Sequence, residues 1–353
     1  MARLKENWKL NVWWKWLVII FIPYVILMGF LIPLGQGIVK ISPYNIKTGQ
    51  STSLTIEGYN TQFDSGDDIK AWIKHNDWHL QASAVEIINQ QEAVLHFEVP
   101  PYIDNTLTNV DLALVMDTRQ GPIVLPSAVN LNNAPAEMNG VIAWSKDKIS
   151  VRPESNFNYP FRNILGETIR NTYFHVPLWF AMTVLFMLSV YYSIRHLRFK
   201  HQEDDLWAQS LVSIGILFGI LGTITGSIWA RSTWGSYWSF DVKQNMAAIS
   251  LLIYGGYFLL RNSINDPDSK SRVGSIYNIF AFALLIPLIF IIPRRFDSLH
   301  PGNGGNPALG TQDLDNTMRM VFYPAVIAYI FLGYWLSQLR YRIILISNKL
   351  SDI

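Results

Sequence analysis

Six largely apolar stretches of the chain run for 17 to 25 residues without a single Asp, Glu, Lys or Arg. Such runs match the apolar core of a bilayer, which needs about 20 apolar residues in each crossing helix. Charged residues make up 15% of the chain, well below the roughly 25% of a typical soluble domain. We therefore predict an α-helical integral membrane protein, a six-transmembrane-helix bundle over residues 16–39, 171–194, 206–230, 244–260, 273–293 and 320–339.

The distribution of Lys and Arg predicts how these helices are oriented. Six crossings put both termini on one side, and short cytoplasmic loops are enriched in Lys and Arg. With the N-terminus in the cytoplasm, 13 of these residues fall on the cytoplasmic side and five fall in short outer segments. We therefore expect both termini in the cytoplasm. The five outer cations fit either an anionic ligand or anchoring at the membrane surface: Arg231, Lys243, Arg294, Arg295 and Arg319.

A polar insertion separates the first two predicted helices, and its pattern predicts strands. Segments such as "STSLTIEGYN" and "VDLALVMDTRQGPIVLP" alternate apolar and polar residues, and Gly and Pro interrupt them at intervals typical of an all-β sandwich. The stretch "ISPYNIKTGQSTSLTIEG" resembles the IPT/TIG type of immunoglobulin-like fold. We therefore predict an extracytoplasmic immunoglobulin-like β domain at 40–134, between a cytoplasmic N-terminus with the first helix at 1–39 and a connecting arm at 135–170.

Composition and spacing limit the available chemistry. The chain has no cysteine, so it forms no disulfide, no thiolate metal site and no thioether link. Its net charge of +2 gives no general affinity for nucleic acid. The motif "HNDWH" puts His75 and His79 at a spacing that could bind a metal on a helix face, with His96 as a possible third ligand. Because its surroundings predict strand and turn, surface histidines are the favoured interpretation.

Two other histidines fall on the same side of the membrane as a run of aromatic residues. The crossing count puts "NTYFHVP" at the outer end of the second predicted helix, with His175, and "RRFDSLHPGNGG" outside after the fifth, with His300. The stretch "STWGSYWSFD" at 232–241 leaves the third predicted helix on that same side. The remaining pair, His196 and His201, falls on the cytoplasmic side, where we expect surface residues.

Two imidazoles, a shelf of indole rings and nearby cations together fit haem. Imidazole nitrogens are axial ligands of haem iron, aromatic rings cover the apolar porphyrin, and Lys or Arg pairs with its propionates. The alternative is that the aromatic residues form a belt at the membrane surface and that each histidine is an ordinary interfacial residue. The presence of both histidines beside the aromatic segment favours haem.

The aromatic segment also carries a family resemblance. "TGSIWARSTWGSYWSFD" resembles the tryptophan-rich WWD segment, WGxxWxWD, of the CcmC/CcsA haem-handling proteins of cytochrome c maturation. "RNTYFHVP" and "DSLHPG" resemble the two histidine motifs of that family. Phe240 stands where the family usually has Trp, so an indole N–H donor is lost. The positions that match the segment are Trp229, Trp234, Gly235, Trp238 and Asp241.

The resemblance implies a site and its ligand. It implies a five-helix haem-handling domain over 171–353 in the bacterial inner membrane, with haem b on the periplasmic side and Lys243 in place of a more usual Arg. It further implies that Asp241 positions its loop or accepts a hydrogen bond from a haem chaperone. The implied residues are His175 and His300 as axial iron ligands, a platform of Trp229, Trp234, Tyr237, Trp238, Phe240 and Asp241, and propionate or partner contacts from Arg170 and Lys243.

The leading functional hypothesis is haem capture at the outer face and transfer to a CcmE-like chaperone, together with other membrane subunits of cytochrome c maturation. A transfer protein is expected rather than a classical enzyme. A CcsA-type haem lyase is disfavoured because no histidine lies deep in a predicted helix. A haem exporter permease subunit is disfavoured because the predicted helices show no buried charge pair. A simple membrane anchor for the β domain is the fourth alternative.

Overall fold

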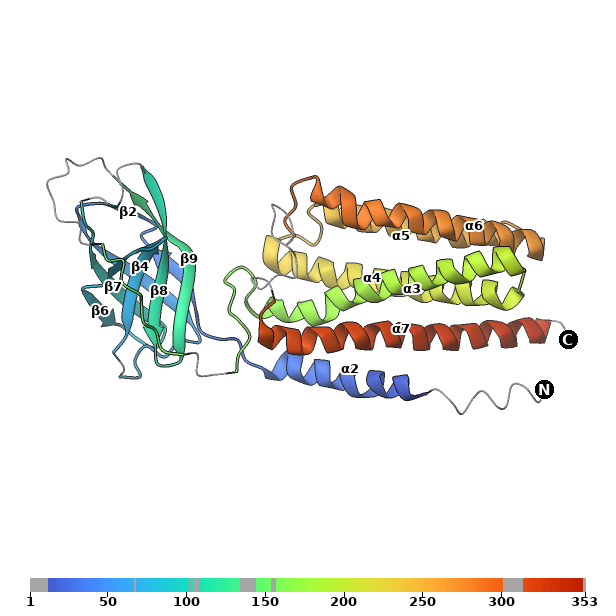
Figure 1. Cartoon of the computed structure of the whole chain (residues 1–353), viewed down its shortest axis with the longest axis horizontal. Coiled ribbons are helices and arrows are strands. Elements are labelled where there is room, and N and C mark those ends of the chain that lie inside the picture. Colours follow the sequence, from blue (N-terminus) through green and yellow to red (C-terminus); the bar gives the residue numbers. More distant parts are fainter. Residues whose placement is uncertain are drawn as a thin grey trace. The chain divides into compact units, whose positions relative to one another are not determined.

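A computed structural model describes residues 12–66, 68–101, 103, 108–133, 144–153, 157–300 and 314–351. The chain forms two compact units. One unit is Ile32–Gly166, and the other consists of the chain up to Leu31 and from Glu167 onward. Figure 1 shows that the first is built of strands and the second of long helices.

The helical unit consists of long, largely apolar helices. A 3₁₀ turn, η1 (Gly166–Asn171), leads into α3, and α6 continues into a π-helical turn, η2 (Pro287–Ile291), and a 3₁₀ turn, η3 (Ile292–Arg294). In the described part of the chain, five helical segments are long and apolar enough to cross a membrane, so this is a multi-pass membrane protein. The helices are α2 (Trp13–Leu31), α3 (Thr172–Phe199), α4 (Gln202–Trp234), α5 (Val242–Asn262), α6 (Pro267–Ile286) and α7 (Asn316–Ser351).

Two predicted helices differ from expectation. The first is shorter than the charge-free run 16–39, because α2 ends at Leu31 and Gly37–Ser42 forms strand β1; Pro33 and Gly35 follow directly and disfavour helix. Helix α5 covers the predicted crossing 244–260 but is not among the five apolar segments. The count of six crossings therefore stays a prediction.

The other unit is a β structure with one core shared by two sheets. The first sheet has the order β1-β3-β7-β6 and the second the order β2-β9-β8-β4-β5. Alternate residues such as Leu54, Leu95 and Leu112 are fully buried in that core. A β-rich insertion is thus confirmed, while its immunoglobulin-like class stays a prediction. The strands after β1 are β2 (Asn45–Lys47), β3 (Ser51–Tyr59), β4 (Lys70–His75), β5 (Trp78–Gln81), β6 (Ala84–Ile87), β7 (Glu92–Glu98), β8 (Asn109–Thr118) and β9 (Gly121–Asn132).

Helices α3 and α4 pack side by side because α4 presents glycines to the larger side chains of α3 (Figure 1). A Cβ atom at any of these glycines would collide with, or press tightly against, an α3 side chain. The spacing of four, three and four residues is the same on both helices, which keeps the contacts on one face of each. The pairs are Gly215 with Phe186, Gly219 with Met182, Gly222 with Trp179 and Gly226 with His175.

A buried ion pair joins α4 and α5 at the ends remote from Trp234 and Val242. The Arg261 guanidinium donates two hydrogen bonds to the Asp205 carboxylate, at 2.6 and 2.7 Å. Both residues are about 95% buried, at 5% and 4% exposed. This pair does not contradict the prediction that the charge-free spans contain no buried charge pair, because both residues lie just outside those spans. Only the packing of the helices brings the two residues together.

Candidate functional site

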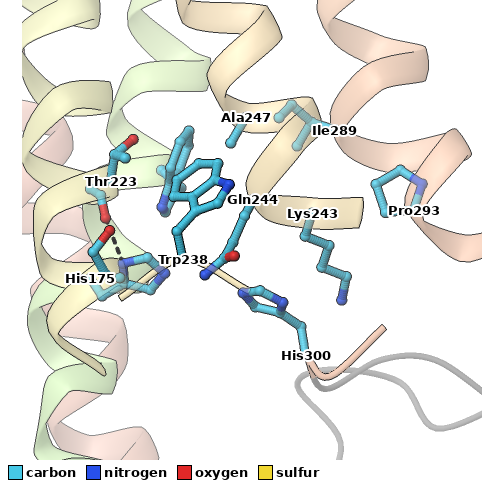
Figure 2. Close-up of a pocket in the computed structure, with 13 residues that line it drawn as sticks. His175, Thr223, Trp238, Lys243, Gln244, Ala247, Ile289, Pro293 and His300 are labelled. Carbon is cyan, nitrogen blue, oxygen red and sulfur yellow. Dashed lines mark hydrogen bonds between the residues drawn. The ribbon is translucent and has the colours of Figure 1, made fainter. Parts of the chain in front are cut away.

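A cavity of about 700 Å³, its open mouth included, lies where α4 ends and α5 begins. Residues from α3, α4, the segment between α4 and α5, α5, η2, η3 and the loop after η3 converge on this cavity, as Figure 2 shows. Most of the lining is apolar or aromatic, with a few polar groups among it. The lining residues are His175, Trp179, Gly222, Thr223, Gly226, Ser227, Trp238, Lys243, Gln244, Ala247, Ile289, Pro293 and His300.

His175 lies in the first turn of α3 and is held against α4. Its Nδ1 is 2.9 Å from the carbonyl oxygen of Gly222 and 3.2 Å from the hydroxyl of Thr225. Since a carbonyl oxygen can only accept, Nδ1 carries the proton and Nε2 keeps a free lone pair. A Cβ at position 226 would lie 2.6 Å from the His175 ring, so the glycine makes room for the imidazole. The indole of Trp229 packs edge-on against the ring, with the ring centroids 5.9 Å apart.

His300 lies in the loop after α6 and is held by a carboxylate. Its Nδ1 is 2.8 Å from Oδ1 of Asp241, so this nitrogen donates and Nε2 again remains available. The Trp234 indole packs edge-on against the ring, with centroids 4.8 Å apart. Burial lowers the pKa of His300 below its ordinary value, and the nearby Asp241 carboxylate only partly opposes this effect. The neutral form, which can ligate a metal, is therefore favoured.

Asp241 ties the start of α5 to the loop that carries His300. Gly235, with a φ of +83°, ends α4 in the left-handed conformation, and Asp241 then caps α5 by accepting from the backbone N–H of Lys243 at 2.9 Å. It also accepts from Ser298 Oγ at 3.1 Å and from the Leu299 N–H at 2.8 Å. Burial raises the pKa of Asp241, but these hydrogen bonds outweigh burial and hold the pKa below its ordinary value.

The first residues of α5 supply polar groups to the cavity. Lys243 and Gln244 both line it. The side-chain oxygen of Gln244 accepts from the N–H and the hydroxyl of Ser239, at 2.9 and 3.1 Å. Its amide nitrogen makes no hydrogen bond within the described part of the chain, so it is available as a donor to a ligand in the cavity. Gln244 as a whole is 9% exposed.

The structure gathers some of the predicted site residues and leaves others apart. Trp238 lines the cavity, whereas Tyr237 and Phe240 are 61% and 78% exposed. Arg170 does not line it, because its guanidinium pairs with Glu167 at 2.6 Å and donates to the carbonyl of Gly29. The roles assigned to these residues therefore stay predictions.

Sequence reasoning missed several residues that shape the cavity. Trp179 lies one helical turn after His175, and Gly222 and Gly226 belong to the glycine row of α4. The signal for them was present in "GILFGILGTITG", where four glycines recur at helical spacing. Gln244 had no such signal, because its importance comes only from the direction of its side chain.

None of the other described histidines lines the cavity. His75 and His79 occupy the paired strands β4 and β5 next to their tight turn, and His96 on β7 contacts Ser53 and Glu86. His79 is buried, at 7% exposed, and so is His196, at 5%, which corrects the expectation of surface histidines at these two positions. The Nδ1 of His196 donates to the backbone carbonyl of His201 at 2.9 Å. Among the described residues no group of three or more His, Asp and Glu side chains could hold a metal ion.

The fold and the site define a multi-pass membrane protein with two histidines in an aromatic cavity at one end of its helices. Residues 157–352 match the family model CcmC, described as Heme exporter protein C, and the chain therefore belongs to this family. It is 28% identical over 186 residues to "Heme exporter protein C" of Bradyrhizobium diazoefficiens, covering 51% of this chain and 68% of that protein.

Two further relatives extend the comparison. A "Cytochrome c biogenesis protein CcsA" of Pelargonium hortorum is 38% identical over 92 residues, covering 26% of this chain and 29% of that protein. "Heme exporter protein C" of Paracoccus denitrificans is 27% identical over 122 residues, covering 34% and 51%. The matched region thus spans less than two thirds of each of these two proteins.

Proposed function

We propose that this protein binds haem between His175 and His300 and passes it to a chaperone during cytochrome c maturation. The observation that carries the proposal is that both histidines line one cavity and that each has its Nδ1 engaged by another group. Each imidazole therefore offers Nε2, and imidazole nitrogens are common axial ligands of haem iron. The names printed for the relatives concern haem and cytochrome c biogenesis, which agrees with this assignment.

The residues present fit haem in their chemistry. Trp179 and Trp238 offer aromatic faces to an apolar macrocycle. Lys243 and the amide of Gln244 offer donors to its carboxylates. Non-covalent binding of haem b follows, because the chain has no cysteine for thioether links.

Different residues of the chain would take part in the capture and in the release of haem. His175 is fixed by helix packing, whereas His300 lies on a loop and is held by Asp241. Tyr237 and Phe240 are exposed next to the cavity and are placed to contact lipid or a partner. We propose that a CcmE-like chaperone approaches on this side, and that the remaining topology follows the sequence prediction, with six crossings of the bacterial inner membrane, both termini in the cytoplasm and the immunoglobulin-like unit outside.

Absorption spectroscopy of the purified protein tests the proposal. We expect a low-spin spectrum of haem with two histidine ligands in the wild type, and its loss in the double variant His175→Ala/His300→Ala. The double variant His196→Ala/His201→Ala is the matched control, because it removes two histidines from the opposite ends of α3 and α4 and should keep the spectrum. An unchanged Soret band in the first variant would exclude this site.

A second candidate is covalent attachment of haem to apocytochrome, which the local similarity to CcsA proteins favours. No third histidine lines the cavity among the described residues, so a further ligand set for such a reaction is not visible there. Co-expression with an apocytochrome c and no other maturation protein separates the two functions. Covalent haem on the cytochrome would establish a haem lyase, and loading of a haem chaperone alone would establish transfer.

A further inference from the structure

The two histidines of the cavity differ in the groups that hold them. His175 donates its Nδ1 proton to a neutral backbone carbonyl, and His300 donates its own to the carboxylate of Asp241. A carboxylate that accepts from a ligating imidazole fixes the orientation of the ring and makes the ligand more basic. Hydrogen bonding of this kind is also one of the means by which a protein sets the potential of haem iron.

We propose that Asp241 is a positioning residue for His300 and that, through this ring, it sets the reduction potential of the bound haem. The inference rests on the proposed haem site and adds an assignment to it. A more basic imidazole donates more electron density to the iron and stabilises the ferric state relative to the ferrous state. Asp241 should therefore lower the potential, and the carbonyl that holds His175 should do so much less.

Asp241 has the geometry for this role. Asp241 is 8% exposed, and its carboxylate receives four hydrogen bonds, from Lys243 N, Ser298 Oγ, Leu299 N and His300 Nδ1. Three of them fix the carboxylate and the loop, so the fourth leaves the His300 ring little freedom to rotate. The Trp234 indole, edge-on at 4.8 Å, limits the ring on another side.

Potentiometric titration of the haem-loaded protein tests the proposal with two matched variants. Asp241→Asn removes the charge while keeping an oxygen that can accept from His300, so a purely structural role would leave the potential nearly unchanged. Asp266→Asn is the control: Asp266 caps α6 by accepting from Ser269 N–H at 2.8 Å, and it contacts no histidine. We expect the first variant to keep two histidine ligands with a more positive potential, and the second to match the wild type.

The size of the shift reports the strength of the effect. A tenfold loss in the preference for ferric over ferrous haem corresponds to about 59 mV for one electron, and a shift of that order is expected for Asp241→Asn. Equal potentials in the wild type and Asp241→Asn would overturn the proposal while leaving haem binding intact.

A third variant covers the case in which Asp241→Asn binds no haem. Asp241→Glu keeps the charge, and recovery of haem with a potential near that of the wild type would support the proposal. Absence of haem in both variants would assign Asp241 to loop structure alone and overturn it. Absence of haem from the wild-type protein would instead refute the proposed function.

Discussion

His175 and His300 reach the same cavity by opposite structural means. His175 is part of a helix, in a notch that Gly226 leaves open, and a neutral carbonyl holds it. His300 belongs to a loop whose position depends on one buried carboxylate. Helix packing resists displacement, because interiors are close-packed and tolerate little added volume. The comparison teaches that the cavity combines one histidine that helix packing holds rigidly with another whose orientation depends on a contact between a loop and a single carboxylate.

The largest expected effect comes from filling the notch behind the rigid ligand. Gly226→Ala puts a methyl group 2.6 Å from the present position of the His175 ring, so ring or helix must move. Overpacking of this kind costs about 1–3 kcal/mol, and haem affinity should fall roughly five- to 160-fold, measured by haem titration. The control is Gly255→Ala, whose added Cβ has no neighbour within 4 Å. Equal affinity in both variants would show that His175 is not confined by α4.

Acid should weaken haem binding through His300, the histidine on the loop. Ligation needs neutral imidazole, and the pKa of His300 lies below its ordinary value of 6.5. Haem affinity should therefore be constant above pH 6.5 and fall about tenfold for each pH unit below the pKa of His300. Haem titrations between pH 8 and pH 5 check this expectation. Weakening that starts between pH 8 and pH 7 would contradict the assigned direction of the shift.

A moderate effect is expected from replacing Gln244, whose side-chain amide lines the cavity. Gln244→Leu removes the donor that has no partner among the described residues, and a hydrogen bond to a charged group contributes about 1.5 kcal/mol. Affinity for haem should fall roughly tenfold, while affinity for haem dimethyl ester, which lacks the carboxylates, should change less. Gln202→Leu at the far end of α4 is the control. Equal losses for both ligands would show that Gln244 does not bind the carboxylates.

The smallest effect is expected from removing the more distant of the two hydrogen-bond partners of His175. Thr225→Val removes a hydroxyl 3.2 Å from Nδ1, but the Gly222 carbonyl remains at 2.9 Å. Haem affinity should change less than threefold, or about 0.6 kcal/mol, as expected when a neutral hydrogen bond has an alternative acceptor. A loss of tenfold or more in the same titration would show that the hydroxyl, and not the carbonyl, orients this histidine.

The helices and the β-rich insertion could be predicted from the sequence because their signals are local. Long apolar runs without charge predict membrane-spanning helices, and alternation of apolar and polar residues predicts strands with one buried face. The limits of such signals are also visible: the charge-free run to Val39 includes the start of a strand. His196 and His79 looked like surface residues because local polarity says nothing about what covers a side chain in the folded chain.

The sequence by itself determined the class of protein, the family motif around Trp234, Trp238 and Asp241, and the two histidines worth attention. Only the tertiary structure decided that Asp241 holds His300, 59 residues away, that glycines of α4 make room for His175, and that Arg261 meets Asp205. These contacts join residues far apart in the chain, and their strength depends on burial and direction. Neither the burial of a side chain nor its direction can be predicted from composition or spacing, because both arise only when the helices pack.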